Sequence, residues 1–181
     1  MKNLFFLLLP LFIISCKGVE QHRASIDELS AKWDAATKEI TDHKTMVSSD
    51  LTNYTQALAA LQPDEATKAK MKPEEITAMD ASHKVVTDAL NAYPTHLKTI
   101  SDFEATWNEK AEEVTALKDG LAAGKMEGDV NAKITELNAM VATANENLTA
   151  WKAAYATIKS TVETAFASIN QTQGTIGNAN G

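Results

Sequence analysis

The sequence predicts an all-α protein, folded as an elongated antiparallel three-helix bundle with heptad, coiled-coil-like packing. Apolar residues recur at alternating spacings of three and four over long stretches, as they do on the buried faces of packed helices. No stretch shows the alternation of apolar and polar residues that is typical of β-strands. Glycine and proline gather at a few places that separate three long periodic segments. Helices joined by such short connectors run up, down and up.

The first expected helix spans residues 25–61. It opens with Ser25 and Glu28, the pattern of a capping box in which each side chain accepts a hydrogen bond from the other residue's backbone N–H. Two successive spacings of four around Val47 predict a local unwinding of the supercoil. The apolar stripe of this segment consists of Ile26, Leu29, Trp33, Ala36, Ile40, His43, Val47, Leu51, Tyr54, Leu58 and Leu61.

The second expected helix begins at Pro73, because proline suits the first position of a helix and two acidic residues follow it. Its stripe keeps one phase through Pro94, which predicts a single helix kinked at Pro94. A break at that point would give four helices instead. The stripe consists of Ile76, Met79, His83, Val86, Leu90, Tyr93, Leu97, Ile100, Phe103, Trp107, Ala111, Val114, Leu117 and Leu121.

The third expected helix follows Gly128, with Asp129 as its N-cap, and closes a bundle domain of residues 25–170. The glycine-containing residues 171–181 are expected to form a disordered tail. Because the connectors are short, facing residues pair in register, and Trp33 is expected level with Phe103. The stripe consists of Val130, Ile134, Leu137, Val141, Ala144, Leu148, Trp151, Tyr155, Ile158, Val162, Phe166 and Ile169.

An apolar run at residues 4–14 is about half as long as a membrane-spanning helix and is typical of a signal peptide. It ends in Ile13-Ile14-Ser15-Cys16, and this small residue before the only cysteine of the chain resembles the lipobox of bacterial lipoproteins. The resemblance implies that residues 1–15 are removed and that Cys16 carries a diacylglycerol. We expect no other cofactor. Residues 16–24 would be the tether. An ordinary signal peptide or an uncleaved anchor is the alternative.

That resemblance places the protein in the bacterial cell envelope, anchored by lipid, with the outer membrane expected and the periplasmic or surface face left open. The 181 residues carry a net charge of −7 without a basic cluster, which argues against nucleic acid as a partner. The sequence contains no phosphate-binding loop, nucleophile elbow, HExxH or CxxC motif. We therefore expect no enzymatic activity.

The histidines are the sharpest alternative to a purely structural bundle. His43 lies on the first stripe, and the hairpin register places His96 near Glu39, one turn from His43. Glu39, His43 and His96 are therefore a candidate interhelical metal site. A weaker candidate pairs Asp80 with His83, and the register across the second connector places Glu163 nearby. Histidines hydrogen-bonded to a neighbour are the ordinary explanation of both.

The leading functional expectation is a non-enzymatic envelope lipoprotein whose bundle acts as a spacer or interaction module for another protein or an envelope polymer. In an up-down-up arrangement, the connector of residues 62–72 lies at the end away from the lipid. Its charged residues are the candidate partner contacts: Asp64, Glu65, Lys68 and Lys70. The alternative is a periplasmic helical bundle that binds a small ligand or a metal.

Overall fold

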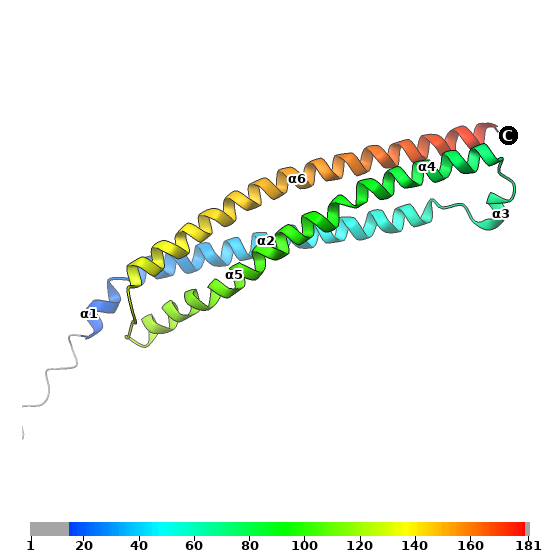
Figure 1. The fold of residues 1–181 in the computed structure, drawn as a ribbon. Coiled ribbons are helices and arrows are strands. Elements are labelled where there is room, and N and C mark those ends of the chain that lie inside the picture. Colours follow the sequence, from blue (N-terminus) through cyan, green and yellow to red (C-terminus); the bar gives the residue numbers. More distant parts are fainter. Residues whose placement is uncertain (1–14, 180–181) are drawn as a thin grey trace, which may run out of the picture. The chain divides into compact units, whose positions relative to one another are not determined.

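Residues 15–179 are described by a computed structural model of the chain (Figure 1). This range is all-α and contains no β-strand, which confirms the predicted fold class. The long helices are α2 (Arg23–Ala60), α4 (Pro73–Leu90), α5 (Ala92–Ala122) and α6 (Val130–Ala179), and the short ones are α1 (Ser15–Glu20) and α3 (Glu65–Lys68). Residues 1–14, most of the expected signal peptide, lie outside the described range.

The chain divides into two compact units. Unit 1 comprises Met1–Glu39 and Phe103–Glu146, and unit 2 comprises Ile40–Asp102 and Asn147–Gly181. Unit 1 therefore holds α1, the first part of α2, the end of α5 and the start of α6. Unit 2 holds the rest of these helices together with α3 and α4.

The core of unit 1 follows the predicted spacing. Its centre is a stack of the two indole rings of Trp33 and Trp107, whose centroids lie 3.6 Å apart at an angle of 12°. Trp33 thus faces Trp107, one turn beyond the expected Phe103, whose ring lies 6.0 Å from that of Trp107. The buried apolar residues include Ile26, Leu29, Trp33, Ala36, Trp107, Val114, Leu117, Leu121, Val130, Ile134, Leu137, Val141 and Ala144.

The core of unit 2 contains more polar and aromatic groups. On α2 the stripe is fully buried as far as Val47, whereas Leu51, Tyr54 and Leu58 beyond it are only half-buried. The other helices bury mainly apolar positions of the predicted stripes. These residues include Met79, Val86, Leu90, Tyr93, Ile100, Leu148, Trp151, Tyr155, Val162 and Ile169.

The prediction of one helix kinked at Pro94 is corrected by the structure, because the chain breaks at Asn91 into α4 and α5. Proline lacks an N–H, and its ring would collide with the carbonyl of Leu90 in a continuous helix. With α5 starting at Ala92, Pro94 falls in a first turn, where backbone N–H groups have no intrahelical partner. The predicted count of three long helices is therefore not confirmed.

Two predicted helix starts are confirmed and one is shifted. Pro73 occupies the first turn of α4, and Asp129 Oδ1 accepts a hydrogen bond of 3.0 Å from the backbone N–H of Ala132 at the start of α6. In contrast, α2 already begins at Arg23, so Ser25 lies inside the helix. The expected tether is ordered in part, because Val19 of α1 is buried and Arg23 forms an ion pair of 2.6 Å with Glu20.

The structure also differs from the prediction at the tail, where α6 continues through residue 179. The side-chain amide of Gln173 donates a hydrogen bond of 2.9 Å to the carbonyl oxygen of Leu61, at the end of α2. The hydroxyls of Thr172 and Ser82 lie 3.0 Å apart, within hydrogen-bond distance. These contacts within unit 2 keep residues beyond Ile169 in the helix.

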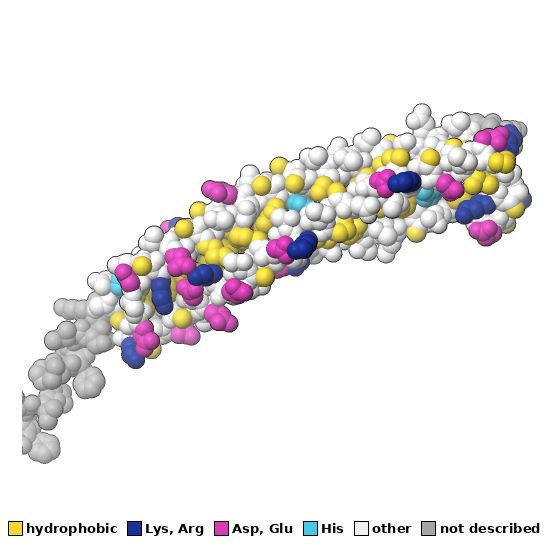
Figure 2. All heavy atoms as spheres, viewed as in Figure 1, with side chains coloured by type: hydrophobic (Ala, Val, Ile, Leu, Met, Phe, Trp, Pro, Cys, Tyr) yellow, Lys and Arg dark blue, Asp and Glu magenta, His cyan; other side chains and the backbone are white. Residues whose placement is uncertain are grey.

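Several charged side chains on the surface form ion pairs, some within one helix and some between helices. Lys98 contacts Asp102 at 2.6 Å one turn along α5, and Lys110 contacts both Glu113 at 2.7 Å and Glu136 at 2.6 Å. Figure 2 shows basic and acidic side chains next to one another on the visible face, in keeping with such pairs. Exposed pairs of this kind each contribute only about 0.2–1 kcal/mol to stability.

Candidate functional site

Two buried histidines lie together in the core of unit 2. His43 of α2 is 3% exposed and His96 of α5 is 7% exposed. Their ring centroids are 5.7 Å apart and the rings are nearly perpendicular, at 89°. His43 reaches this position because it lies on the apolar stripe of α2. His96 follows Tyr93 by three residues and shares its buried face of α5.

Tyrosine rings from three helices extend the histidine pair. The ring centroid of Tyr155 on α6 lies 5.7 Å from that of His43 and 6.2 Å from that of Tyr93 on α5. Tyr93 in turn lies 6.2 Å from Tyr54 of α2. We call His43, Tyr54, Tyr93, His96 and Tyr155 the histidine–tyrosine cluster.

Several polar atoms of this cluster are buried without a hydrogen-bond partner among the described residues. They are both ring nitrogens of His43, Nε2 of His96 and the hydroxyl oxygen of Tyr93. Burial lowers the pKa of both histidines, and repulsion from His96 when it is charged and from Lys152 lowers the pKa of His43 further. Both imidazoles are therefore held in the neutral form at neutral pH.

One edge of the cluster is fully hydrogen-bonded. The hydroxyl of Tyr155 donates to Asp50 Oδ2, and the ammonium of Lys159 lies 3.1 Å from the same oxygen. The hydrogen bond from Tyr155, followed by Lys159, lowers the pKa of Asp50, while burial opposes that shift. Burial and the neighbouring Asp50 raise the pKa of Tyr155. This edge therefore holds a charged carboxylate beside a neutral phenol.

Sequence reasoning did not identify the pairing of Asp50 with Tyr155 and Lys159. Asp50 lies next to the stripe residue Leu51, outside the apolar pattern that guided the prediction. The signal that could have found it is Tyr155 itself, because a buried tyrosine hydroxyl generally requires a partner. Asp50 is a half-buried carboxylate on the facing helix.

Of the three predicted metal ligands, the structure brings His43 and His96 together. Glu39 is exposed and belongs to unit 1. Within residues 15–179, no group of three or more His, Cys, Asp or Glu side chains is arranged to hold a metal ion.

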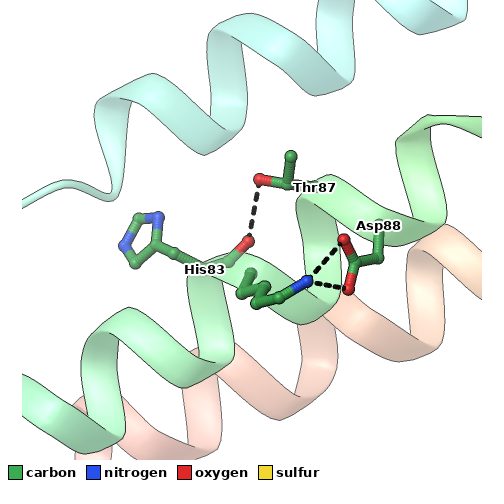
Figure 3. Close-up of polar contacts among 4 residues, drawn as sticks. His83, Thr87 and Asp88 are labelled. Atoms are coloured by element: carbon green, nitrogen blue, oxygen red, sulfur yellow. Dashed lines mark hydrogen bonds and ion pairs between the residues drawn. The ribbon is translucent and has the colours of Figure 1, made fainter.

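The weaker candidate on α4 centres on His83, which is half-buried, whereas Asp80 is exposed. The hydroxyl of Thr87 donates a hydrogen bond of 3.0 Å to the backbone carbonyl of His83. Figure 3 shows the imidazole ring of His83 pointing away from the ion pair in which Lys84 contacts Asp88 at 2.7 Å. These contacts stabilise α4 and create no ligand set.

The predicted partner contacts lie around α3 and are partly engaged in local structure. Asp64 caps α3, because its Oδ1 accepts a hydrogen bond of 2.8 Å from the backbone N–H of Thr67. Lys68 lies 3.8 Å from Glu65 within the same short helix. Lys70 is exposed and forms no ion pair among the described residues. It is therefore the predicted contact whose charge is available to a partner.

A groove of about 770 Å³ lies beside Lys70 in unit 2. Apolar side chains from the ends of α2 and α6, from α4 and from the connector line it, together with the polar residues Gln62, Thr67 and Gln173. The apolar residues include Leu61, Pro63, Met71, Met79 and Ile176. The groove therefore combines apolar and polar lining residues with the unpaired cation of Lys70 at its edge.

Cys16, the predicted lipid attachment site, lies in α1. None of the helices in the described part of the chain is long and apolar enough to cross a membrane. No family model, curated protein or solved structure matches the chain.

Proposed function

We propose that the protein is a non-enzymatic lipoprotein of the bacterial cell envelope, anchored in the outer membrane by a diacylglycerol on Cys16. The observation that carries the proposal is the apolar run of residues 4–14 followed by Ser15 and Cys16. Each buried methylene of a lipid chain contributes about 0.8 kcal/mol, so two or more chains anchor a domain without a spanning helix. The helical domain would then begin close to the membrane, because α2 starts at Arg23.

The helical domain serves, in this proposal, to present an interaction surface rather than to catalyse a reaction. Its contact region is the connector around α3 together with the groove beside Lys70. The whole of α2 separates this connector from Cys16 along the chain. The chemistry of the groove suits a protein segment that inserts an apolar side chain and places an acidic group against Lys70.

A second candidate function is the binding of a small ligand or metal by the histidine–tyrosine cluster. It is favoured by the unpartnered ring nitrogens of His43 and His96, which come from two different helices. Elemental analysis of the purified protein tests it. A stoichiometric metal that is lost in His43→Leu would support this candidate.

The anchor is tested by comparing the wild-type protein with Cys16→Ala. We expect the wild-type protein to fractionate with membranes and to carry the mass of a diacylglycerol, and the variant to lose both properties. An unmodified wild-type protein in the soluble fraction would exclude the lipoprotein assignment. The unfolding free energy of the helical domain should be equal in the two proteins, because the lipid would contribute no contact to either core.

The contact region is tested by photocrosslinking in cells. A photoreactive residue at the exposed position Ala66 is expected to capture a specific partner, whereas one at the exposed position Ala153 of α6 serves as the control. Lys70→Glu should reduce the crosslink by reversing the charge at the groove. Lys98→Glu, on another exposed surface, should leave it unchanged. Equal crosslinking in both charge variants would contradict the assignment, and capture of a glycan would identify an envelope polymer instead.

A further inference from the structure

We propose that unit 2 is a pH-responsive element whose core opens in mild acid through joint protonation of His43 and His96. The proposal concerns the folded domain alone and is independent of the lipid anchor and of the partner. It starts from the geometry of the two rings, which lie 5.7 Å apart in the core and belong to α2 and α5.

Three of the four ring nitrogens of the pair have no hydrogen-bond partner among the described residues. An imidazolium donates through both ring nitrogens. Both nitrogens of His43 and Nε2 of His96 are buried and have no hydrogen-bond partner in the described residues. An imidazolium at His43 would therefore have two buried donors without an acceptor, and one at His96 would have at least one. Charging both rings would place two like charges close together in a medium of low dielectric constant.

The groups that face the pair from the neighbouring helices do not compensate these charges. On α6, Lys152 disfavours a positive charge on His43, and Tyr155 places a neutral phenol ring against it. On α5, Tyr93 is neutral and its hydroxyl is unpartnered. On α2, the half-buried carboxylate of Asp50 is already engaged by Tyr155 and Lys159.

The exposed charges on the same helices lie outside this core. Glu39, Asp42 and Lys98 are solvent-exposed, and Lys44 is half-buried beside His43 in sequence. Exposed carboxylates interact with a buried cation through water and compensate little of its desolvation. The folded state of unit 2 therefore requires two neutral imidazoles.

The direction of the pH dependence follows from this requirement. Burial lowers the pKa of both histidines in the folded state, so the unfolded chain takes up protons more readily. The contribution of the two neutral histidines to stability is fully present above the ordinary histidine pKa of about 6.5. This contribution is lost as the pH falls below that value. The unfolding equilibrium constant then rises by up to tenfold per pH unit for each histidine, or about 100-fold for the pair.

The carboxylate of Asp50 acts in a different range of pH. The lowered pKa of Asp50 also makes the fold less stable in acid, but only as the pH falls below its ordinary value of about 3.9. The interval from about pH 6.5 to about pH 4.5 therefore isolates the histidines from this carboxylate.

The test is urea unfolding of the full-length protein at a series of pH values from about 7 to about 4.5, in the presence of a chelator. We expect the unfolding constant of the wild-type protein to rise at least tenfold over this range. The double variant His43→Leu/His96→Leu should show no such rise, because leucine has a similar volume and no titrating group. His22→Gln removes a histidine outside unit 2 and should behave like the wild type.

An equal rise in the double variant, or no rise in the wild type, would overturn the proposal. A lower stability at about pH 7 on addition of chelator alone would also overturn it, because the pair would then hold a metal.

If the double variant does not fold, the proposal is tested by the imidazole NMR signals of the wild-type protein over the same pH range. We expect the signals of His43 and His96, assigned with single variants, to keep their neutral chemical shifts for as long as the native tyrosine signals of unit 2 persist. A shift to the charged form with those signals intact would contradict the proposal.

Discussion

At the scale of single residues, the indole of Trp107 shows how a polar atom is accommodated in the core of unit 1. Its N–H donates a hydrogen bond of 2.8 Å to the hydroxyl of Thr37, which itself donates to the carbonyl oxygen of Trp33 at 2.8 Å. Trp107 is only 1% exposed, so water cannot replace this partner. Thr37 therefore provides the indole N–H of Trp107 with an acceptor and also holds that indole against Trp33.

We expect Thr37→Val to destabilise the protein by about 1–3 kcal/mol, because it leaves the buried indole N–H without an acceptor while keeping the shape of the side chain. Urea unfolding at neutral pH measures the change. Thr157→Val is the matched control, since the exposed hydroxyl of Thr157 bonds only to a carbonyl of its own helix, and it should change stability by less than about 0.5 kcal/mol. Equal effects would show that the Trp107 hydrogen bond contributes nothing.

The hydrogen bond from Tyr155 to Asp50 predicts a specific change in acid stability. Tyr155→Phe should cost about 1.5–3 kcal/mol at neutral pH, as expected for a hydrogen bond to a charged group. It should also return the pKa of Asp50 toward its ordinary value, because the Tyr155 hydroxyl is the main cause of the lowered pKa. The charged form of Asp50 contributes a part of the unfolding free energy that is present above about pH 4 and lost in stronger acid. This part should be smaller in Tyr155→Phe.

Urea unfolding of Tyr155→Phe at about pH 5 and about pH 2.5 measures this loss. Tyr54→Phe is the control, because the hydroxyl of Tyr54 lies 3.2 Å from Glu163 and does not contribute to the pKa shift of Asp50. An undiminished acid dependence in Tyr155→Phe would rule out this role of the phenol.

The sequence predicted which aromatic and histidine side chains are buried, but it did not predict their hydrogen-bond partners. Apolar spacing placed Trp33, Tyr155 and His43 in the core, and all three are buried. The predicted register was wrong by one turn, because it placed Phe103 next to Trp33 where the structure has Trp107. The hydrogen bond between Trp107 and Thr37 therefore could not be predicted. Polar partners depend on side-chain positions across helices, and periodicity determines these only to within about one turn.

At the scale of secondary-structure elements, the apolar stripes predicted where the helices lie but not where they end. The stripe continued in phase through Pro94, whereas the helix breaks at Asn91. A break that preserves the phase of the buried face leaves no trace in the spacing of apolar residues. The end of α6 was predicted too early, because the glycines near the C-terminus suggested a disordered tail. In the structure, the side chain of Gln173 donates a hydrogen bond to the carbonyl oxygen of Leu61, and the helix continues.

The two classes of glycine in the structure predict opposite effects of alanine. Gly174 lies within α6, and a Cβ there would meet nothing within 4 Å, so Gly174→Ala should stabilise the protein by about 0.5–1 kcal/mol. Gly124 has a φ of +68° in the connector after α5, so Gly124→Ala should cost about 1–2 kcal/mol. Urea unfolding measures both changes. A neutral Gly174→Ala would instead support the disordered tail that the sequence predicted.

At the scale of the whole molecule, the two units share covalent continuity, because α2, α5 and α6 each contain residues of both units. Unfolding one unit alone would require these three helices to end in mid-sequence. Each new helix end leaves four backbone N–H or C=O groups without an intrahelical partner, and no glycine or proline stands at residues 39–40, 102–103 or 146–147 to favour such an end. Unfolding of one unit alone is therefore costly, and opening of the core of unit 2 in mild acid would also destabilise unit 1.

This continuity predicts that a defect in one unit lowers the stability of the entire described chain. Leu137 is fully buried on α6 in unit 1, and Leu137→Ala should cost about 2–5 kcal/mol. Near neutral pH, where both buried histidines are uncharged, amide hydrogen exchange should accelerate in core peptides of unit 2 as well as unit 1. Val162→Ala, a buried substitution on α6 in unit 2, should give the reciprocal result. Faster exchange confined to the substituted unit would show that the helices fray at the boundary and that each unit unfolds separately.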